Sequence, residues 1–205
     1  MTSKSVCLLL TFVYVVAFVE SVDIGKMEKG EIVPDVIDKI PSEVLKVIYP
    51  SGASVELGNE LTPTQVKDEP ITVNWTADPN TFYTVAMVDP DAPSREDPKL
   101  REVLHWLVGN VKGGDVENGE VIAGYRGSGP PQGTGLHRYV FLVYQQNGKI
   151  DFKEKKIDSR SREGRLNFSI RKFAVNYSLG QPVAGNYYQA QFDDYVPILQ
   201  SQTIQ

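Results

Sequence analysis

The order of apolar and polar residues along the chain predicts many short strands. Segments 82–88 and 103–111 are apolar on both faces of an extended strand, as strands buried inside a sheet are. Segment 44–49 is apolar and β-branched, 54–57 predicts a briefer strand, and Asn118-Gly119 signals a tight turn. Short strands at this spacing predict a mainly β fold, either a sandwich or a barrel.

Two further segments are predicted strands: 71–76 alternates between apolar and polar residues, which indicates one buried face, and 138–145 is a strand with three of its large apolar side chains on one face. The alternation in the first segment also leaves Asn74 facing solvent. The residues expected to face inward are Ile71, Val73 and Trp75 in the first segment and Tyr139, Phe141 and Val143 in the second.

Short helices are predicted near both ends of the chain. One is expected at 34–40, with Pro34 in its first turn, and one at 194–200, with Pro197 in its first turn. A third follows from an apolar stripe at helical spacing, capped by Asn167 and ended by Gly180. The stripe consists of Leu166, Ile170, Phe173, Ala174 and Tyr177.

The composition fits one globular domain and argues against nucleic acid as a partner. The chain has 205 residues, of which 41% are hydrophobic and 23% charged. Its net charge is −5, and the densest basic run, 153–156, is interrupted by an acid. A nucleic-acid binder normally carries a basic stripe. We therefore expect a monomer that binds no nucleic acid and does not adsorb strongly to anionic membranes.

The first 21 residues have the pattern of a signal peptide. Lys4 precedes an apolar run over 6–19, broken only by Thr11. That run is shorter than the roughly 20 apolar residues a membrane-spanning helix needs. Small residues suit cleavage after Ser21 or after Ala17. We expect a secreted domain over 22–205 without a transmembrane segment, the alternative being an uncleaved anchor.

Export would bring two further consequences. Cys7 is the only cysteine and lies in the signal peptide, so the mature chain cannot form a disulfide. Three N-x-S/T sequons, at Asn74, Asn167 and Asn176, become candidates for glycosylation. At Asn167 this competes with the predicted role as a helix cap.

The densest polar segment is Asp89-Pro90-Asp91-Ala92-Pro93-Ser94-Arg95, directly after a predicted buried strand. The prolines fix the backbone, and rigid loops that leave a sheet often carry binding groups. The alternative is a proline-rich turn in which the aspartates bond their own backbone.

Two histidines follow in the sequence. His105 lies among apolar residues, so its ring needs a partner, and an Asp89–His105 pair that favours the imidazolium form is reasonable. His137 and Tyr139 follow the loop 127–135, whose glycines allow backbone N–H groups to approach an anion. Alternatively, His105 is a core residue with its bonds satisfied, and His137 follows a wide surface hairpin.

Familiar enzyme sites fit poorly. Segment 126–129 lacks the first glycine of a hydrolase elbow, and two histidines without a mature cysteine cannot make a four-ligand zinc site. Asp89 and Asp91 are too close in sequence to flank a sugar. We expect a protein that is not an enzyme and holds no metal or cofactor. An iron site of two histidines and one carboxylate leaves a metal-assisted hydrolase as an alternative.

The sequence resembles the phosphatidylethanolamine-binding protein family over about residues 44–199. The resemblance is carried by segments 89–95, 101–108, 127–144 and 182–197. It implies a β-sandwich with short peripheral and C-terminal helices, a cis peptide at Ala92-Pro93, and a small pocket for phosphate or carboxylate anions. The positions that match the pocket or support it are Asp89, Asp91, Arg101, His105, Gly129, Pro130, His137, Tyr139 and Tyr188.

The resemblance implies a secreted binding protein for phospholipid head groups, such as phosphoethanolamine, or for other small anions. Inhibition of a serine protease, or another protein interaction, is the alternative function. The chain departs from many family members at Leu104, where they carry a histidine or an aromatic residue. That departure puts the choice of head group in question.

Overall fold

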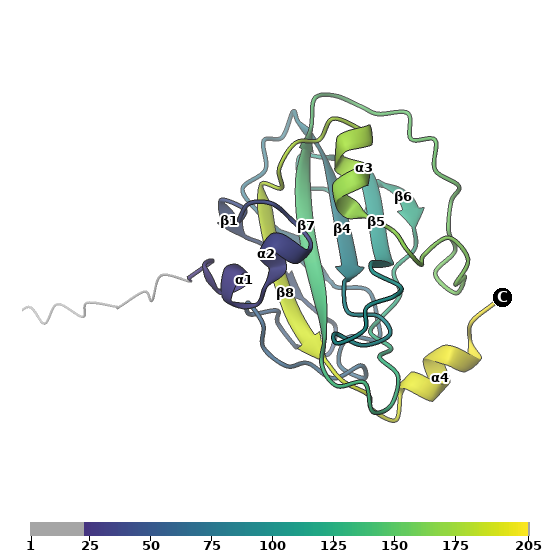
Figure 1. Ribbon diagram of the computed structural model, residues 1–205. Coiled ribbons are helices and arrows are strands. Elements are labelled where there is room, and N and C mark those ends of the chain that lie inside the picture. The colour runs from purple at the N-terminus through teal and green to yellow at the C-terminus, as the bar shows by residue number, and fades with distance from the viewer. Residues whose placement is uncertain (1–22, 205) are drawn as a thin grey trace, which may run out of the picture.

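The computed structural model describes residues 23–204 and shows a mainly β architecture, as the sequence predicts (Figure 1). Six strands form one sheet in the order β1-β8-β7-β4-β5-β6, and β2 pairs with β3 in a second sheet. The strands are β1 (Glu43–Val44), β2 (Lys46–Ile48), β3 (Thr72–Asn74), β4 (Phe82–Asp89), β5 (Val103–Lys112), β6 (Glu120–Ala123), β7 (His137–Gln146) and β8 (Ala184–Ala190). The helices are α1 (Lys26–Lys29), α2 (Ile32–Asp35), α3 (Ile170–Asn176) and α4 (Val196–Ser201). The predicted signal peptide lies outside the described residues.

Both faces of the six-stranded sheet are buried, which explains why its central strands are apolar throughout. One face packs against the two-stranded sheet, and the other packs beneath α1, α2 and α3 (Figure 1). Strand β7 shows the division, because its side chains alternate between the two cores. Tyr139, Phe141 and Val143 enter the first core, as predicted, and Val140, Leu142 and Tyr144 enter the second.

The edge strand β3 is shorter than its alternation predicts. Trp75 is buried and meets Tyr83 edge-on, and Asn74 is exposed, both as predicted. Ile71, however, is 70% exposed, so its predicted inward position is wrong. It lies one residue before β3 at the end of a two-stranded sheet, where no further layer covers it. Segment 54–57 likewise forms only a single bridge, between Ser54 and Ile48.

Two of the three predicted helices differ from the observed ones. Helix α3 starts at Ile170 because the Ser169 hydroxyl accepts a hydrogen bond from the N–H of Lys172. Asn167 has a left-handed φ of 57° and lies outside the helix, so its predicted cap is wrong. Helix α2 ends at Asp35, and the residues after it leave the helix and bury apolar side chains in the second core. Helix α4 begins near Pro197, as predicted.

A buried ion cluster fastens the N-terminal segment to β7. Arg138 is fully buried and donates to both oxygens of Asp91, at 2.7 and 2.8 Å, and to Asp35 at 2.7 Å. It also donates to the carbonyl oxygens of Gly30 and Glu31, both at 2.9 Å. Burial disfavours the charged form of Asp91, but the hydrogen bonds and charge of Arg138 outweigh it and lower the pKa of that carboxyl.

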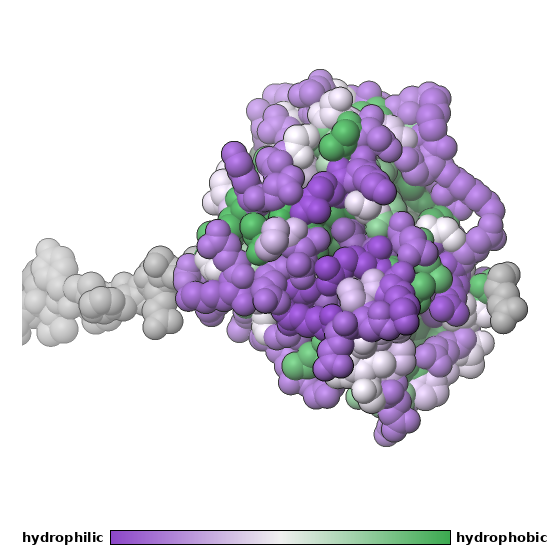
Figure 2. All heavy atoms as spheres, viewed as in Figure 1, coloured by the Kyte–Doolittle hydropathy of each residue, from purple (hydrophilic) through white to green (hydrophobic). Residues whose placement is uncertain are grey.

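The surface drawn in Figure 2 is mostly hydrophilic, and its apolar residues form separate small patches. Among residues 23–204, no helix has both the length and the apolar character needed to cross a membrane.

Candidate functional site

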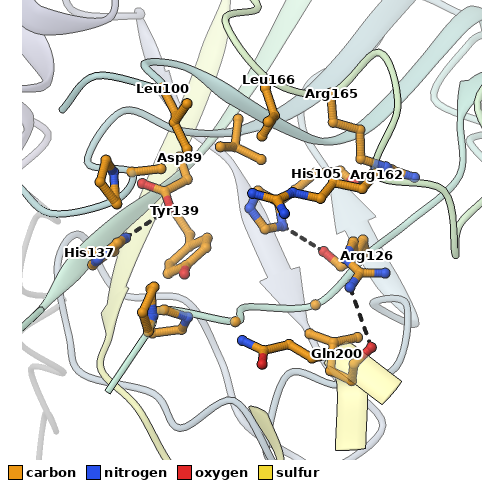
Figure 3. A pocket seen from close by; sticks show the side chains of 18 of the residues that line it. Asp89, Leu100, His105, Arg126, His137, Tyr139, Arg162, Arg165, Leu166 and Gln200 are labelled. Atoms are coloured by element: carbon orange, nitrogen blue, oxygen red, sulfur yellow. Dashed lines mark hydrogen bonds and ion pairs between the residues drawn. The ribbon is translucent and has the colours of Figure 1, made fainter. Parts of the chain in front are cut away.

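A cavity of about 460 Å³ opens at the edge of the large sheet where β4 ends and β7 begins (Figure 3). Its size lies within the range of about 300–1,000 Å³ that is usual for small-molecule pockets. Four parts of the chain enclose it: the loop after β4, the loop before β7, segment 162–166 and helix α4. The central polar residues are Asp89, His105, His137 and Tyr139.

Asp89 and His137 form a fixed pair at one end of the pocket. Asp89 is the last residue of β4 and His137 the first of β7, and these strands are antiparallel neighbours. His137 Nδ1 lies 3.0 Å from Asp89 Oδ2, and Asp89 Oδ1 accepts the N–H of Asp91 at 2.7 Å. His137 Nε2 lies 2.9 Å from the Thr134 hydroxyl. Both side chains are almost fully buried, so their orientation is set before any ligand arrives.

His105 enters the site from β5. The sequence predicted an Asp89–His105 pair, and this prediction is wrong. Its Nδ1 lies 2.8 Å from the carbonyl oxygen of Arg126, which can only accept, so Nδ1 carries the proton. Burial lowers the pKa of His105 to about 4 and outweighs the opposing effect of the Asp89 charge. The ring is therefore neutral rather than an imidazolium, and its Nε2 is left as an acceptor.

The titration of His105 can be measured directly. We expect the C2 proton of His105 to show no titration between pH 5.5 and 8 in NMR spectra, because the imidazolium form is disfavoured by burial. His137 is the only other histidine, and a His137→Gln variant assigns the two signals. A midpoint near the ordinary value of about 6.5 for His105 would contradict this account.

Two tyrosines form the floor beside the histidines. Tyr139 stacks on Tyr188 with ring centroids 5.1 Å apart, and it meets the His105 ring edge-on at 5.1 Å. The Tyr188 hydroxyl lies 2.6 Å from the Ser128 hydroxyl. Burial raises the pKa of both tyrosines above their ordinary value. Tyr139 lines the cavity, whereas Tyr188 supports it from behind.

The backbone of the glycine-rich loop packs closely against neighbouring segments at two of its glycines. A Cβ on Gly127 would lie 2.8 Å from the carbonyl oxygen of Val66, and one on Gly129 would lie 3.0 Å from a methyl group of Leu199. Gly129 and Pro130 line the cavity. The loop thus reaches helix α4 through a contact that leaves little room for a side chain.

Asp91 and Arg101 do not line the cavity, although the sequence places them among the ligand-binding candidates. Asp91 is occupied by Arg138, and Arg101 donates to the carbonyl oxygen of Pro90. Both therefore act behind the wall, where they hold the Asp89 loop in place. The peptide bond between Ala92 and Pro93 is cis, as the resemblance implies.

Sequence reasoning missed the opposite wall of the pocket. Arg126 directly precedes the glycine-rich loop, so the sequence could have indicated it. The other missed residues come from distant segments, and their neighbours in the sequence form no recognisable motif. The missed lining residues include Arg126, Arg162, Arg165, Leu166, Leu199, Gln200 and Thr203. Within residues 23–204, no three His, Cys, Asp or Glu side chains gather in a way that suits a metal ion.

Comparisons with known proteins place the chain in a family. The family model described as phosphatidylethanolamine-binding protein matches residues 51–188. A Drosophila melanogaster protein named "Putative odorant-binding protein A5" is 46% identical over 173 residues, which cover 84% of this chain and 82% of that protein.

Two solved structures are also similar to this chain. The solution structure of CG7054 is 52% identical, with a TM-score of 0.70 over 85% of this chain and 99% of that one. Carboxypeptidase Y inhibitor, solved in complex with its cognate proteinase, is 30% identical, with a TM-score of 0.69 over 83% and 95% of the two chains.

Proposed function

The chain belongs to the phosphatidylethanolamine-binding protein family, and we propose that its pocket binds the phosphate of a phospholipid head group or a comparable small anion. The observation that carries the proposal is the convergence of Asp89, His105 and His137 from β4, β5 and β7 on one cavity. The similar proteins bear names of binding proteins and of an inhibitor, which favours a binding role over catalysis.

The hydrogen-bonding groups of the pocket match a phosphate monoester with an amine. Such a phosphate has a second pKa near 6, so it offers both acceptor oxygens and, in part, a hydroxyl. The neutral His105 Nε2 accepts that hydroxyl or an ammonium proton, and the Tyr139 hydroxyl and loop N–H groups can donate to the remaining oxygens. Asp89 attracts the ammonium of a zwitterionic head group.

Thermal unfolding tests this proposal. We expect phosphoethanolamine to raise the melting temperature in a concentration-dependent way, because a ligand at about 100 times its Kd stabilises the folded state by about 2.7 kcal/mol. Inorganic phosphate should act more weakly, and ethanolamine without the phosphate should have little effect. If no phosphate compound shifts the transition, the proposed ligand class is wrong.

We also propose that the protein is secreted and glycosylated. The apolar run over 6–19 supports secretion, and the three sequon asparagines, Asn74, Asn167 and Asn176, are all exposed, as glycosylation requires. Expression of the full chain in insect cells should deliver the protein to the medium with a cleaved N-terminus and a mass that falls after glycosidase treatment. Retention in the cells with residue 1 intact would contradict secretion.

Protease inhibition is a second candidate function, favoured by the similarity to carboxypeptidase Y inhibitor over most of both chains. A stoichiometric excess of the protein should then slow a serine carboxypeptidase or another member of a serine-protease panel. Uniform inactivity across that panel would exclude this candidate and leave the anion-binding proposal intact.

A further inference from the structure

The pocket has a second polar end that the proposed head-group site does not use. Arg126, Arg162 and Arg165 line it on the side away from Asp89 and His137 (Figure 3). Arg126 lies in the loop after β6, and the other two lie in the segment before α3. The Asp89 carboxylate at one end of the pocket is paired with the His137 imidazole, whereas the other end carries three guanidinium groups.

These three guanidinium groups differ from the other arginines in having no carboxylate partner. The chain has eight arginines. Arg95, Arg101, Arg138, Arg160 and Arg171 each lie within 4.0 Å of an Asp or Glu oxygen. Among residues 23–204, the unpaired arginines are the three that line the pocket. The positive charge at this end is therefore not neutralised by the protein itself.

Each of the three arginines has a distinct part. Arg165 is buried and donates all five of its N–H groups to backbone carbonyl oxygens, so it contributes a fixed charge and no free donor. Arg126 donates to the Leu199 carbonyl oxygen and the Thr203 hydroxyl, which places its guanidinium against α4. The exposed Arg162 side chain makes no hydrogen bond or ion pair within residues 23–204, so its donors are free for a ligand.

We propose that the arginine end is a second anion subsite, so that the pocket takes a ligand with two anionic groups joined by an apolar spacer. The phosphate lies at the Asp89–His137 end, as in the proposed function on which this inference rests, and a carboxylate lies at Arg162 and Arg126. The cavity also has the apolar wall that such a spacer needs. That wall is formed by Leu100, Val103 and Leu166.

The inference is tested with two matched series of ligands. Alkyl phosphates carry one anion, and ω-carboxyalkyl phosphates of the same chain lengths carry two. Both series are titrated calorimetrically against the wild-type protein and the variants Arg162→Gln and Arg160→Gln. Arg160→Gln is the control. It removes the same charge as Arg162→Gln, but Arg160 lies two residues earlier, is exposed and does not line the pocket.

At the best spacer length, we expect the added carboxylate to tighten binding by about tenfold or more in the wild type and in Arg160→Gln, the size of one charge-assisted hydrogen bond. Arg162→Gln should lose that gain and bind the plain alkyl phosphate as the wild type does. Equal affinities for the two series at every length, or equal losses in both variants, would overturn the second subsite.

The two proposals can fail separately in this experiment. If alkyl phosphates do not bind, but carboxyalkyl phosphates bind and weaken in Arg162→Gln, the phosphate site is wrong and the arginine subsite stands. If alkyl phosphates bind and the carboxylate adds nothing, the head-group proposal stands and the arginine subsite is wrong.

Discussion

Replacing Arg138 by methionine is expected to lower the free energy of unfolding by about 3–5 kcal/mol, the cost of breaking one side of a buried ion pair. Arg138 and Asp91 both have fully buried side chains. The methionine would leave Asp91 without its guanidinium partner and would free the carbonyl oxygens of Gly30 and Glu31. Because the N-terminal segment is fastened through these bonds, we expect it to become more accessible to proteases as well.

A neighbouring arginine provides the matched control for this prediction. Arg95 pairs with Glu31 and approaches the carbonyl oxygen of Gly30, but the side chains of Arg95 and Glu31 are 37% and 64% exposed. Exposed ion pairs contribute about 0–1 kcal/mol, so Arg95→Met should change stability little. Chemical denaturation measures both variants. Equal losses in the two would show that the burial of Arg138 does not determine its effect.

Replacing His137 by alanine is expected to weaken phosphoethanolamine binding by about 10- to 100-fold, because the phosphate would then face a buried carboxylate that has lost its imidazole partner. The imidazole Nδ1 lies 3.0 Å from Asp89 Oδ2 and is the side-chain partner of that carboxylate. Without it, Asp89 becomes an unpaired buried charge beside the phosphate. Calorimetric titration gives the affinity, and denaturation of the same sample shows whether the variant remains folded.

The double variant Asp89→Asn, His137→Ala separates the two effects. It should recover part of the stability lost in His137→Ala, because it removes the unpaired carboxylate. It should not recover wild-type affinity, because the Asp89 carboxylate that attracts the ammonium is removed as well. Binding of wild-type strength in either variant would mean that the phosphate lies elsewhere.

The parts of the fold that local patterns determine were predicted well. Strands β4, β5 and β7 carry apolar residues on both faces, and a sheet buried on both sides requires that. Errors arose where distant residues decide the outcome. Ile71 fits the alternating pattern of its segment, but it lies where no layer covers it. Ser169 rather than Asn167 caps α3, because the backbone at Asn167 is left-handed.

The site was predictable only in part, for the same reason. Asp89 and His137 lie at the ends of strands, so their presence at one edge of the sheet could be inferred from the sequence. Their pairing could not, because it depends on β4 and β7 being neighbours. Arg162 and Arg165 follow a long irregular segment, and only the tertiary structure brings them to the pocket.

The most direct test is an amide and side-chain NMR titration of the protein with phosphoethanolamine. Saturable shifts should concentrate on His105 and His137, on Gly129 in the loop that faces them, and on no distant cluster. An Arg160→Gln sample titrated over the same concentrations should show the same ligand-induced shifts as the wild type. Saturable binding that shifts another region while these three residues stay still would refute the assignment of this cavity as the ligand site.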